Sequence, residues 1–66
     1  MKIEEAIRYF ERELEKVEEA EATEAATAEP DEDLLHAWSY EREATDMALT
    51  ALRVIWARLV CLGIDV

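Results

Sequence analysis

Residues 32–63 of this chain read EDLLHAWSYEREATDMALTALRVIWARLVCLG, and this stretch decides the fold. No glycine or proline interrupts it before position 63, so one helix can run from about 32 to 62, a rod of roughly 46 Å at about 1.5 Å per residue. From 47 to 62, every residue except Thr50, Arg53 and Arg58 is apolar. A helix that is apolar over most of its circumference is buried on more than one side.

Both ends of this helix carry recognisable signals. Pro30 disfavours helical geometry at the residue before it, and Asp31 then places a capping carboxylate at the start of the helix. We therefore expect a turn at 28–31. At the other end, Gly63 is expected to adopt a left-handed conformation, with Ile64 folding back on Leu59 in a Schellman ending.

Steps of about 100° per residue divide the long helix into two apolar faces. The bulky face contains Leu34, Trp38, Leu49, Leu52, Trp56, Leu59 and Val60. The second face contains Ala37, Tyr40, Ala44, Met47, Ala51, Val54, Ile55 and Leu62. Its alanines recur every seven residues, which lets another helix approach closely. We predict that this second face is an oligomer interface.

The first half of the chain predicts a shorter helix over about 2–26. Its apolar residues, Ile3, Ile7, Phe10, Leu14 and Val17, follow spacings of four and three and so form one stripe. Glu21 and Glu24 occupy the next positions of the stripe, so its capacity to bury surface ends near Val17. Alanines after that point sustain helix propensity with little to bury.

The expected fold is therefore all-α: an antiparallel two-helix hairpin with a long second helix. The first helix can cover only one of the two apolar faces. A chain of 66 residues has a small core, and its single cysteine cannot form an internal disulfide. We expect these hairpins to assemble as a homo-oligomeric helical bundle, a dimer or larger, for which two hairpins forming four helices are the smallest arrangement.

Charge excludes some partners. The net charge is −10, and residues 1–33 hold thirteen acidic residues against four basic ones. This acidic half repels phosphate backbones, which argues against direct nucleic-acid binding. The apolar stretch at 47–62 is shorter than the ~20 residues of a membrane span and contains two arginines, so no membrane insertion is expected. A lone thiol and a charged start without signal-peptide character favour the cytoplasm.

Two residues invite a chemical interpretation. His36 follows Glu32 and Asp33 by about one helical turn, a spacing that can point two metal ligands the same way, but an exposed histidine beside acids explains it equally. Cys61 lies among apolar residues and has no base nearby, so we expect a buried structural thiol. With no catalytic set and no glycine-rich loop, the sequence predicts neither an enzyme nor a metal or cofactor site.

The strongest candidate for a ligand site is Trp38, Arg42, Arg53 and Trp56, which lie within about 60° of one another on the long helix. Two aromatic rings and two guanidinium groups can stack a base and hold its phosphate. The alternative is that both tryptophans anchor a core or interface while the arginines pair with acids of the first helix. The sequence leaves both open.

The acidic side of the first helix supports another interpretation. Its glutamates, among them Glu11, Glu15, Glu18 and Glu19, resemble a row of phosphates and could occupy a basic groove of a nucleic-acid-binding protein. A solvated charged face is the simpler explanation.

The opening MKIEEAI at 1–7 and the segment DMALTAL at 46–52 resemble small acidic helical accessory proteins of bacteriophages and prophages. That resemblance implies a protein that blocks a host protein or sequesters a host defence signal. It transfers no functional residue, because these proteins share no site motif. We expect a non-enzymatic binding protein that oligomerises through its second helix and captures a bacterial host protein or nucleotide signal. The alternatives are an acidic nucleic-acid mimic and a purely structural helical assembly.

Overall fold

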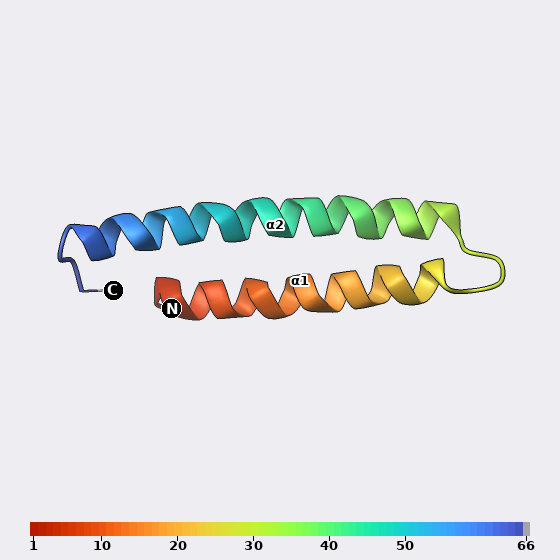
Figure 1. Cartoon of the computed structure of the whole chain (residues 1–66), viewed down its shortest axis with the longest axis horizontal. Coiled ribbons are helices and arrows are strands. Elements are labelled where there is room, and N and C mark those ends of the chain that lie inside the picture. The colour runs from red at the N-terminus through yellow and green to blue at the C-terminus, as the bar shows by residue number, and fades with distance from the viewer. Residues whose placement is uncertain (66) are drawn as a thin grey trace.

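A computed structural model describes residues 1–65, which form two α-helices, α1 (Ile3–Ala25) and α2 (Glu32–Cys61). The helices lie side by side in opposite directions, joined by residues 26–31 (Figure 1). The molecule is a rod of 52 × 15 × 14 Å. The predicted all-α class is confirmed, and each helix begins and ends within one residue of the expected range.

Polar side chains organise the connection between the helices. The Asp31 carboxylate accepts hydrogen bonds from the backbone N–H groups of Asp33 and Leu34 at 3.0 and 3.1 Å, which confirms the expected cap. Glu24, the residue before the last of α1, accepts a hydrogen bond from the backbone N–H of Asp31 at 2.8 Å. Glu24, one of the two glutamates at stripe positions beyond Val17, therefore ties the end of α1 to the start of α2.

The end of α2 has the expected Schellman geometry. Gly63 has φ of 74°, its N–H donates to the carbonyl of Val60 at 3.0 Å, and the N–H of Ile64 donates to the carbonyl of Leu59 at 3.0 Å. Only glycine adopts this left-handed conformation without a steric penalty. The chain turns away from the helix axis at this point.

The core is one narrow seam between the helices. On α2 the residues at alternating steps of three and four are buried or half-buried: Leu35, Trp38, Arg42, Thr45, Leu49, Leu52, Trp56 and Leu59. We call these residues the inner seam. Leu49 and, on α1, Val17 are buried, with 1% and 4% of their surface exposed. The 3–4 spacing is that of a coiled coil, in which a seam follows a repeat of 3.5 residues.

The predicted bulky face of α2 was wrong at two positions. Leu34 and Val60 are 39% and 48% exposed. Each stands one residue, about 100°, away from a member of the inner seam, Leu35 or Leu59. The seam includes Leu35, Arg42 and Thr45 because its path follows the 3.5-residue repeat regardless of side-chain polarity.

Two ion pairs cross between the helices. The Nε of Arg42 lies 3.1 Å from the Oε1 of Glu21, and the Nη2 of Arg53 lies 3.6 Å from the Oε2 of Glu11. Partly exposed pairs of this kind contribute less than about 1 kcal/mol each. Both pairs belong to the same antiparallel register. The pair of Arg42 with Glu21 extends specific interhelical contacts beyond Val17, where the apolar stripe of α1 ends, whereas the pair of Arg53 with Glu11 lies alongside that stripe.

Candidate functional site

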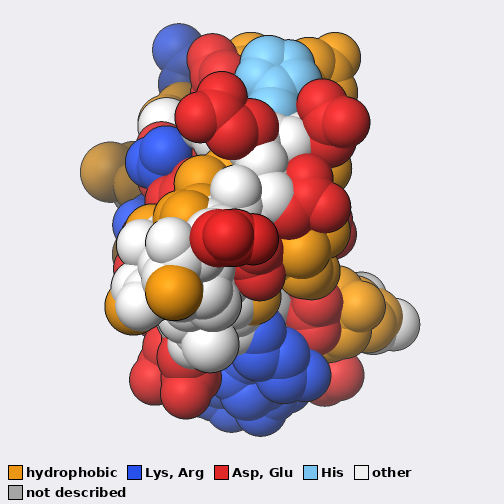
Figure 2. All heavy atoms as spheres, turned by 90° about the vertical axis from the view of Figure 1, so that its right-hand side faces the viewer, with side chains coloured by type: hydrophobic (Ala, Val, Ile, Leu, Met, Phe, Trp, Pro, Cys, Tyr) orange, Lys and Arg blue, Asp and Glu red, His pale blue; other side chains and the backbone are white. Residues whose placement is uncertain are grey.

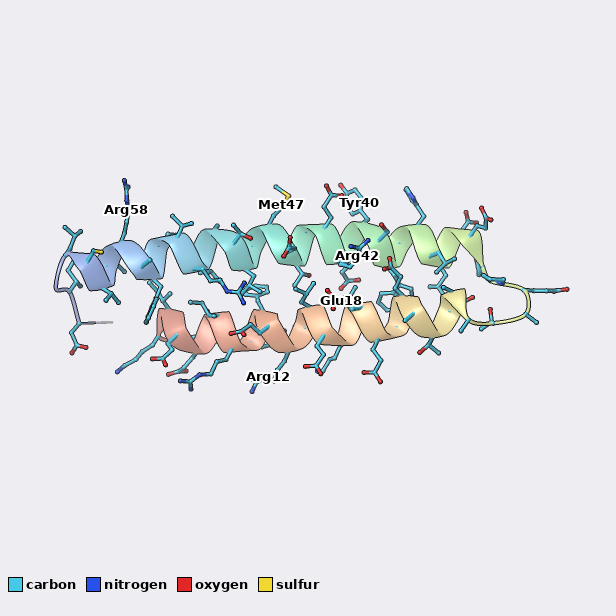
Figure 3. The ribbon with its side chains drawn as sticks, viewed as in Figure 1. Arg12, Glu18, Tyr40, Arg42, Met47 and Arg58 are labelled. Atoms are coloured by element: carbon cyan, nitrogen blue, oxygen red, sulfur yellow. The ribbon has the colours of Figure 1, made fainter. Side chains whose placement is uncertain are left out.

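The most prominent surface feature is a row of uncovered apolar side chains on α2. All eight residues predicted as an oligomer interface are exposed: Ala37, Tyr40, Ala44, Met47, Ala51, Val54, Ile55 and Leu62. We call them the outer apolar face. Tyr40, Met47 and Val54 keep 73%, 67% and 58% of their surface. Figure 3 shows Tyr40 and Met47 pointing away from α1.

The outer apolar face has an ordered composition. Ala37, Ala44 and Ala51 form one column seven residues apart, and Tyr40, Met47 and Val54 form a second column with the same repeat. Arg58 continues the alanine column and Cys61 continues the bulky one, and both are exposed. The side chain of Arg58 also points away from α1 (Figure 3), and among residues 1–65 it makes no ion pair. Contiguous exposed apolar surface of this kind marks interaction sites.

The expectation of a buried Cys61 was wrong for the single hairpin, because its thiol is exposed. The residue is the last of α2 and belongs to the bulky column of the outer face rather than to the inner seam. Its apolar neighbours in the sequence therefore do not cover it.

The four candidate ligand residues of α2 do not meet in one chain. Trp38 and Trp56 are eighteen residues apart, about 27 Å along a helix. Arg42 lies near the first tryptophan and Arg53 near the second, so the set divides into two separate places. Both tryptophans belong to the inner seam and are half-buried, as the alternative interpretation of core anchors expects.

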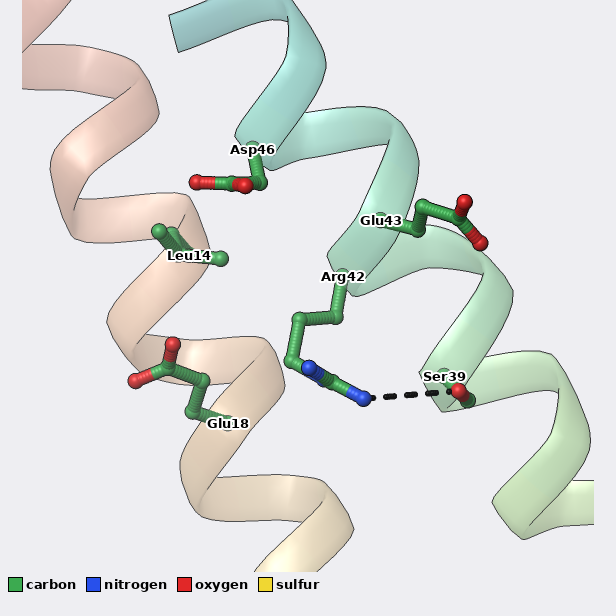
Figure 4. A pocket seen from close by; sticks show the side chains of 6 residues that line it. All are labelled: Leu14, Glu18, Ser39, Arg42, Glu43 and Asp46. Carbon is green, nitrogen blue, oxygen red and sulfur yellow. Dashed lines mark hydrogen bonds between the residues drawn. The ribbon is translucent and has the colours of Figure 1, made fainter. Parts of the chain in front are cut away.

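Arg42 lines a small pocket of about 280 Å³ with Leu14, Glu18, Ser39, Glu43 and Asp46 (Figure 4). Its Nη2 donates a hydrogen bond to the Oγ of Ser39 at 3.4 Å. Its buried Nε lies within ion-pair distance of Glu21, although the N–H is not aligned for a hydrogen bond with that carboxylate. One guanidinium stands here among several carboxylates, so the pocket repels a phosphate.

Trp56 lines a groove of about 460 Å³ together with Glu4, Ile7, Arg8, Glu11, Arg53 and Ala57. Its Nε1–H is buried and has no hydrogen-bond partner, a state that costs about 1–3 kcal/mol. The two arginines of the groove already pair with carboxylates, Arg8 with Glu4 and Arg53 with Glu11. An anionic ligand here would have to displace those carboxylates.

His36 lies in an acidic environment near the connecting loop. It is exposed and shares a shallow depression of about 600 Å³ with Glu18, Glu21 and Glu32. Acidic side chains stand on both sides of the histidine ring when the molecule is viewed from the loop end (Figure 2). Within residues 1–65, no three histidine, cysteine or carboxylate side chains gather as metal ligands.

The acidic side of α1 is not a continuous row of free carboxylates. Glu11 pairs with Arg53, and Glu18 lines the pocket of Arg42. Arg12 points away from α2 into solvent (Figure 3), which places a positive charge on the solvent-facing side of α1. Glu15 and Glu19 remain exposed.

Within residues 1–65, neither helix has an apolar segment long enough to cross a membrane.

The sequence interpretation missed the polar members of the inner seam and the tie made by Glu24. A strict 3–4 spacing applied to α2 identifies Arg42 and Thr45 as inward-facing, because their positions rather than their polarity decide it. The hydrogen bond of Glu24 has no comparable sequence signal.

Comparison of the chain with protein-family models, with curated proteins and with solved structures gave no match.

Proposed function

We propose that this chain is a non-enzymatic binding protein of the phage accessory type, which assembles with copies of itself through the outer apolar face of α2 and captures a bacterial host component. The observation that carries the proposal is that face, whose large side chains keep 48% or more of their surface exposed in the hairpin. The captured component is a host protein or a nucleotide signal, and the two are separated by experiment below.

Assembly is supported by the small core of the hairpin. Only Leu49 and Val17 are buried among the described residues, and chains of this length rarely reach comfortable stability from one core. Complete burial of a large apolar side chain stabilises by about 1.5–3 kcal/mol. Covering several residues of the outer face would therefore add stability on the scale of a whole small domain.

The charge distribution supports a protein as the captured component. Three arginines, Arg8, Arg42 and Arg53, already lie beside carboxylates. The net charge of −10 further opposes a phosphorylated ligand. Exposed carboxylates such as those of Glu15 and Glu19 instead suit a basic protein surface, the partner that a nucleic-acid mimic would also bind.

Light scattering coupled to gel filtration tests the assembly. We expect a dimer or larger species at micromolar concentration for the native chain and a monomer for Met47→Glu, which places a charge in the centre of the outer apolar face. The matched control is Thr23→Glu, which adds the same charge at an exposed position of α1, outside the outer apolar face, and should keep the native size. A stable native monomer would contradict the proposal.

Thermal melting with a panel of linear and cyclic nucleotides tests the nature of the captured component. A nucleotide ligand predicts a rise in Tm that is lost in Trp56→Phe or Arg53→Gln. A flat response across the panel removes nucleotides and leaves a protein. In that case binding to a basic partner should weaken as salt rises and when Glu15 and Glu19 are both changed to Gln, since both effects reduce the attraction between the charged surfaces.

A further inference from the structure

We propose that the outer apolar face is occupied by a second copy of this chain, with the two α2 helices antiparallel and a twofold axis beside position 49. The inference rests on the proposed assembly through α2 and adds the orientation and register of the pair. Three observations support it: the order of side-chain sizes on the outer face, the placement of charges on that face, and the position of α1 on the opposite side of α2.

Side-chain size favours the antiparallel orientation. In an antiparallel pair with a 3.5-residue repeat, each column of one helix packs opposite the other column of its partner. Every alanine then meets a larger residue: Ala37 meets the partner's Cys61, Ala44 meets the partner's Val54, and Ala51 meets the partner's Met47. The gap between the helices is thus nearly uniform. A parallel pair sets alanine against alanine and Tyr40 against the partner's Tyr40, which gives layers of very unequal width.

Charge points to the same orientation and fixes the register. In a parallel pair Arg58 would face the partner's Arg58, which is repulsive. In the antiparallel pair it faces the ring of the partner's Tyr40, beside the partner's Glu41, where it gains a cation–π contact and an ion pair. All three residues are exposed in the hairpin and available for these contacts. The two columns of the outer side together hold eight positions: 37, 40, 44, 47, 51, 54, 58 and 61. If one helix is shifted by seven residues in either direction, two of these eight positions no longer lie opposite a column residue of the partner.

The position of α1 favours a second copy as the occupant. Because α1 packs on the inner seam, pairing through the outer face leaves both α1 helices on the outside of the assembly. The α1 helices, each with nine carboxylates against three basic groups, then lie on opposite sides of the pair. The nearly neutral α2 helices meet in the middle, so self-repulsion is small at the contact and partly screened farther out.

Disulfide trapping tests the inference and uses the native Cys61. In Ala37→Cys, the new thiol lies opposite the partner's Cys61, and mild oxidation should join most of the protein into covalent dimers. Within one chain these two cysteines are about 36 Å apart on the same helix and cannot pair. The native chain and the double variant Ala37→Cys/Cys61→Ser should both stay uncrosslinked, because neither places two thiols opposite each other.

The other outcomes are distinct. Crosslinked dimers of the native chain, through two Cys61 residues, would show a parallel pair and overturn the inference while leaving assembly through α2 intact. Dimers by light scattering that fail to crosslink in Ala37→Cys, both by oxidation and with a short bis-maleimide, would overturn this register. A native monomer would remove the proposed function together with the inference.

Discussion

Leu49 is the most deeply buried large side chain among residues 1–65. Its side chain is 1% exposed, at the middle of the inner seam, whereas its neighbours along that seam are half-buried. A slender two-helix rod has few positions that water cannot reach, because each helix covers only one side of the other. Residues with similar chemistry therefore contribute very differently according to their position around α2.

Leu49→Ala should lower the free energy of unfolding by about 2–4 kcal/mol, since it removes buried methyl groups and leaves a cavity that a rigid seam fills incompletely. Urea unfolding followed by circular dichroism measures this change at one fixed protein concentration. Leu34→Ala is the matched control: Leu34 is 39% exposed, and its truncation should cost less than about 1 kcal/mol. Equal losses for both variants would contradict the described seam.

At the scale of the elements, the start of α2 depends on one side chain. The Asp31 carboxylate accepts two backbone hydrogen bonds, and the backbone N–H of the same residue donates to Glu24 at 2.8 Å. The cap and the end of α1 are thus joined through Asp31. A change at this position affects the helix and the turn together.

Asp31→Ala should destabilise the chain by about 1 kcal/mol, because the first N–H groups of α2 lose their acceptor. The thermal midpoint by circular dichroism reports the loss. Asp31→Ser retains a capping oxygen and should remain close to the native value. A midpoint unchanged in Asp31→Ala would mean that water replaces the cap without cost.

The elements could be predicted from the sequence because their signals are local. Pro30, Asp31 and Gly63 each act within one helical turn, and the apolar period of each half specifies a helix. The path of the inner seam was harder to predict from the sequence. Leu34 and Leu35 are equally apolar, and only the position of α1 decides which of the two is covered. The four candidate ligand residues were grouped by their angle around the helix axis. That angle says nothing about distance along the axis, which separates Trp38 from Trp56.

At the scale of the whole molecule, the decisive property is the division of α2 into two seams on different sides. The inner seam joins α2 to α1, and the outer apolar face remains uncovered in the hairpin. A change on the outer face should therefore act on association directly and lower the stability of the hairpin only through the lost assembly. This separation makes the charges of the outer face suitable for an experiment on the assembled pair.

Arg58→Glu should weaken the proposed dimer about tenfold or more, because the new carboxylate would lie beside the partner's Glu41 and lose the contact with the partner's Tyr40. Sedimentation equilibrium gives the dissociation constant. Adding Glu41→Arg in the same chain reverses both charges and should restore much of the affinity. No recovery in the double variant would mean that the two positions do not face each other.

The half-buried tryptophans carry one more consequence. Trp38 and Trp56 lie near the two ends of the inner seam, whereas Tyr40 lies on the outer apolar face. Indole emission therefore reports the opening of the contact between α1 and α2. The ultraviolet absorbance of tyrosine instead responds, in part, to whatever covers Tyr40. The native chain thus contains separate optical probes for folding and for association, and the two equilibria can be followed in one sample without an added label.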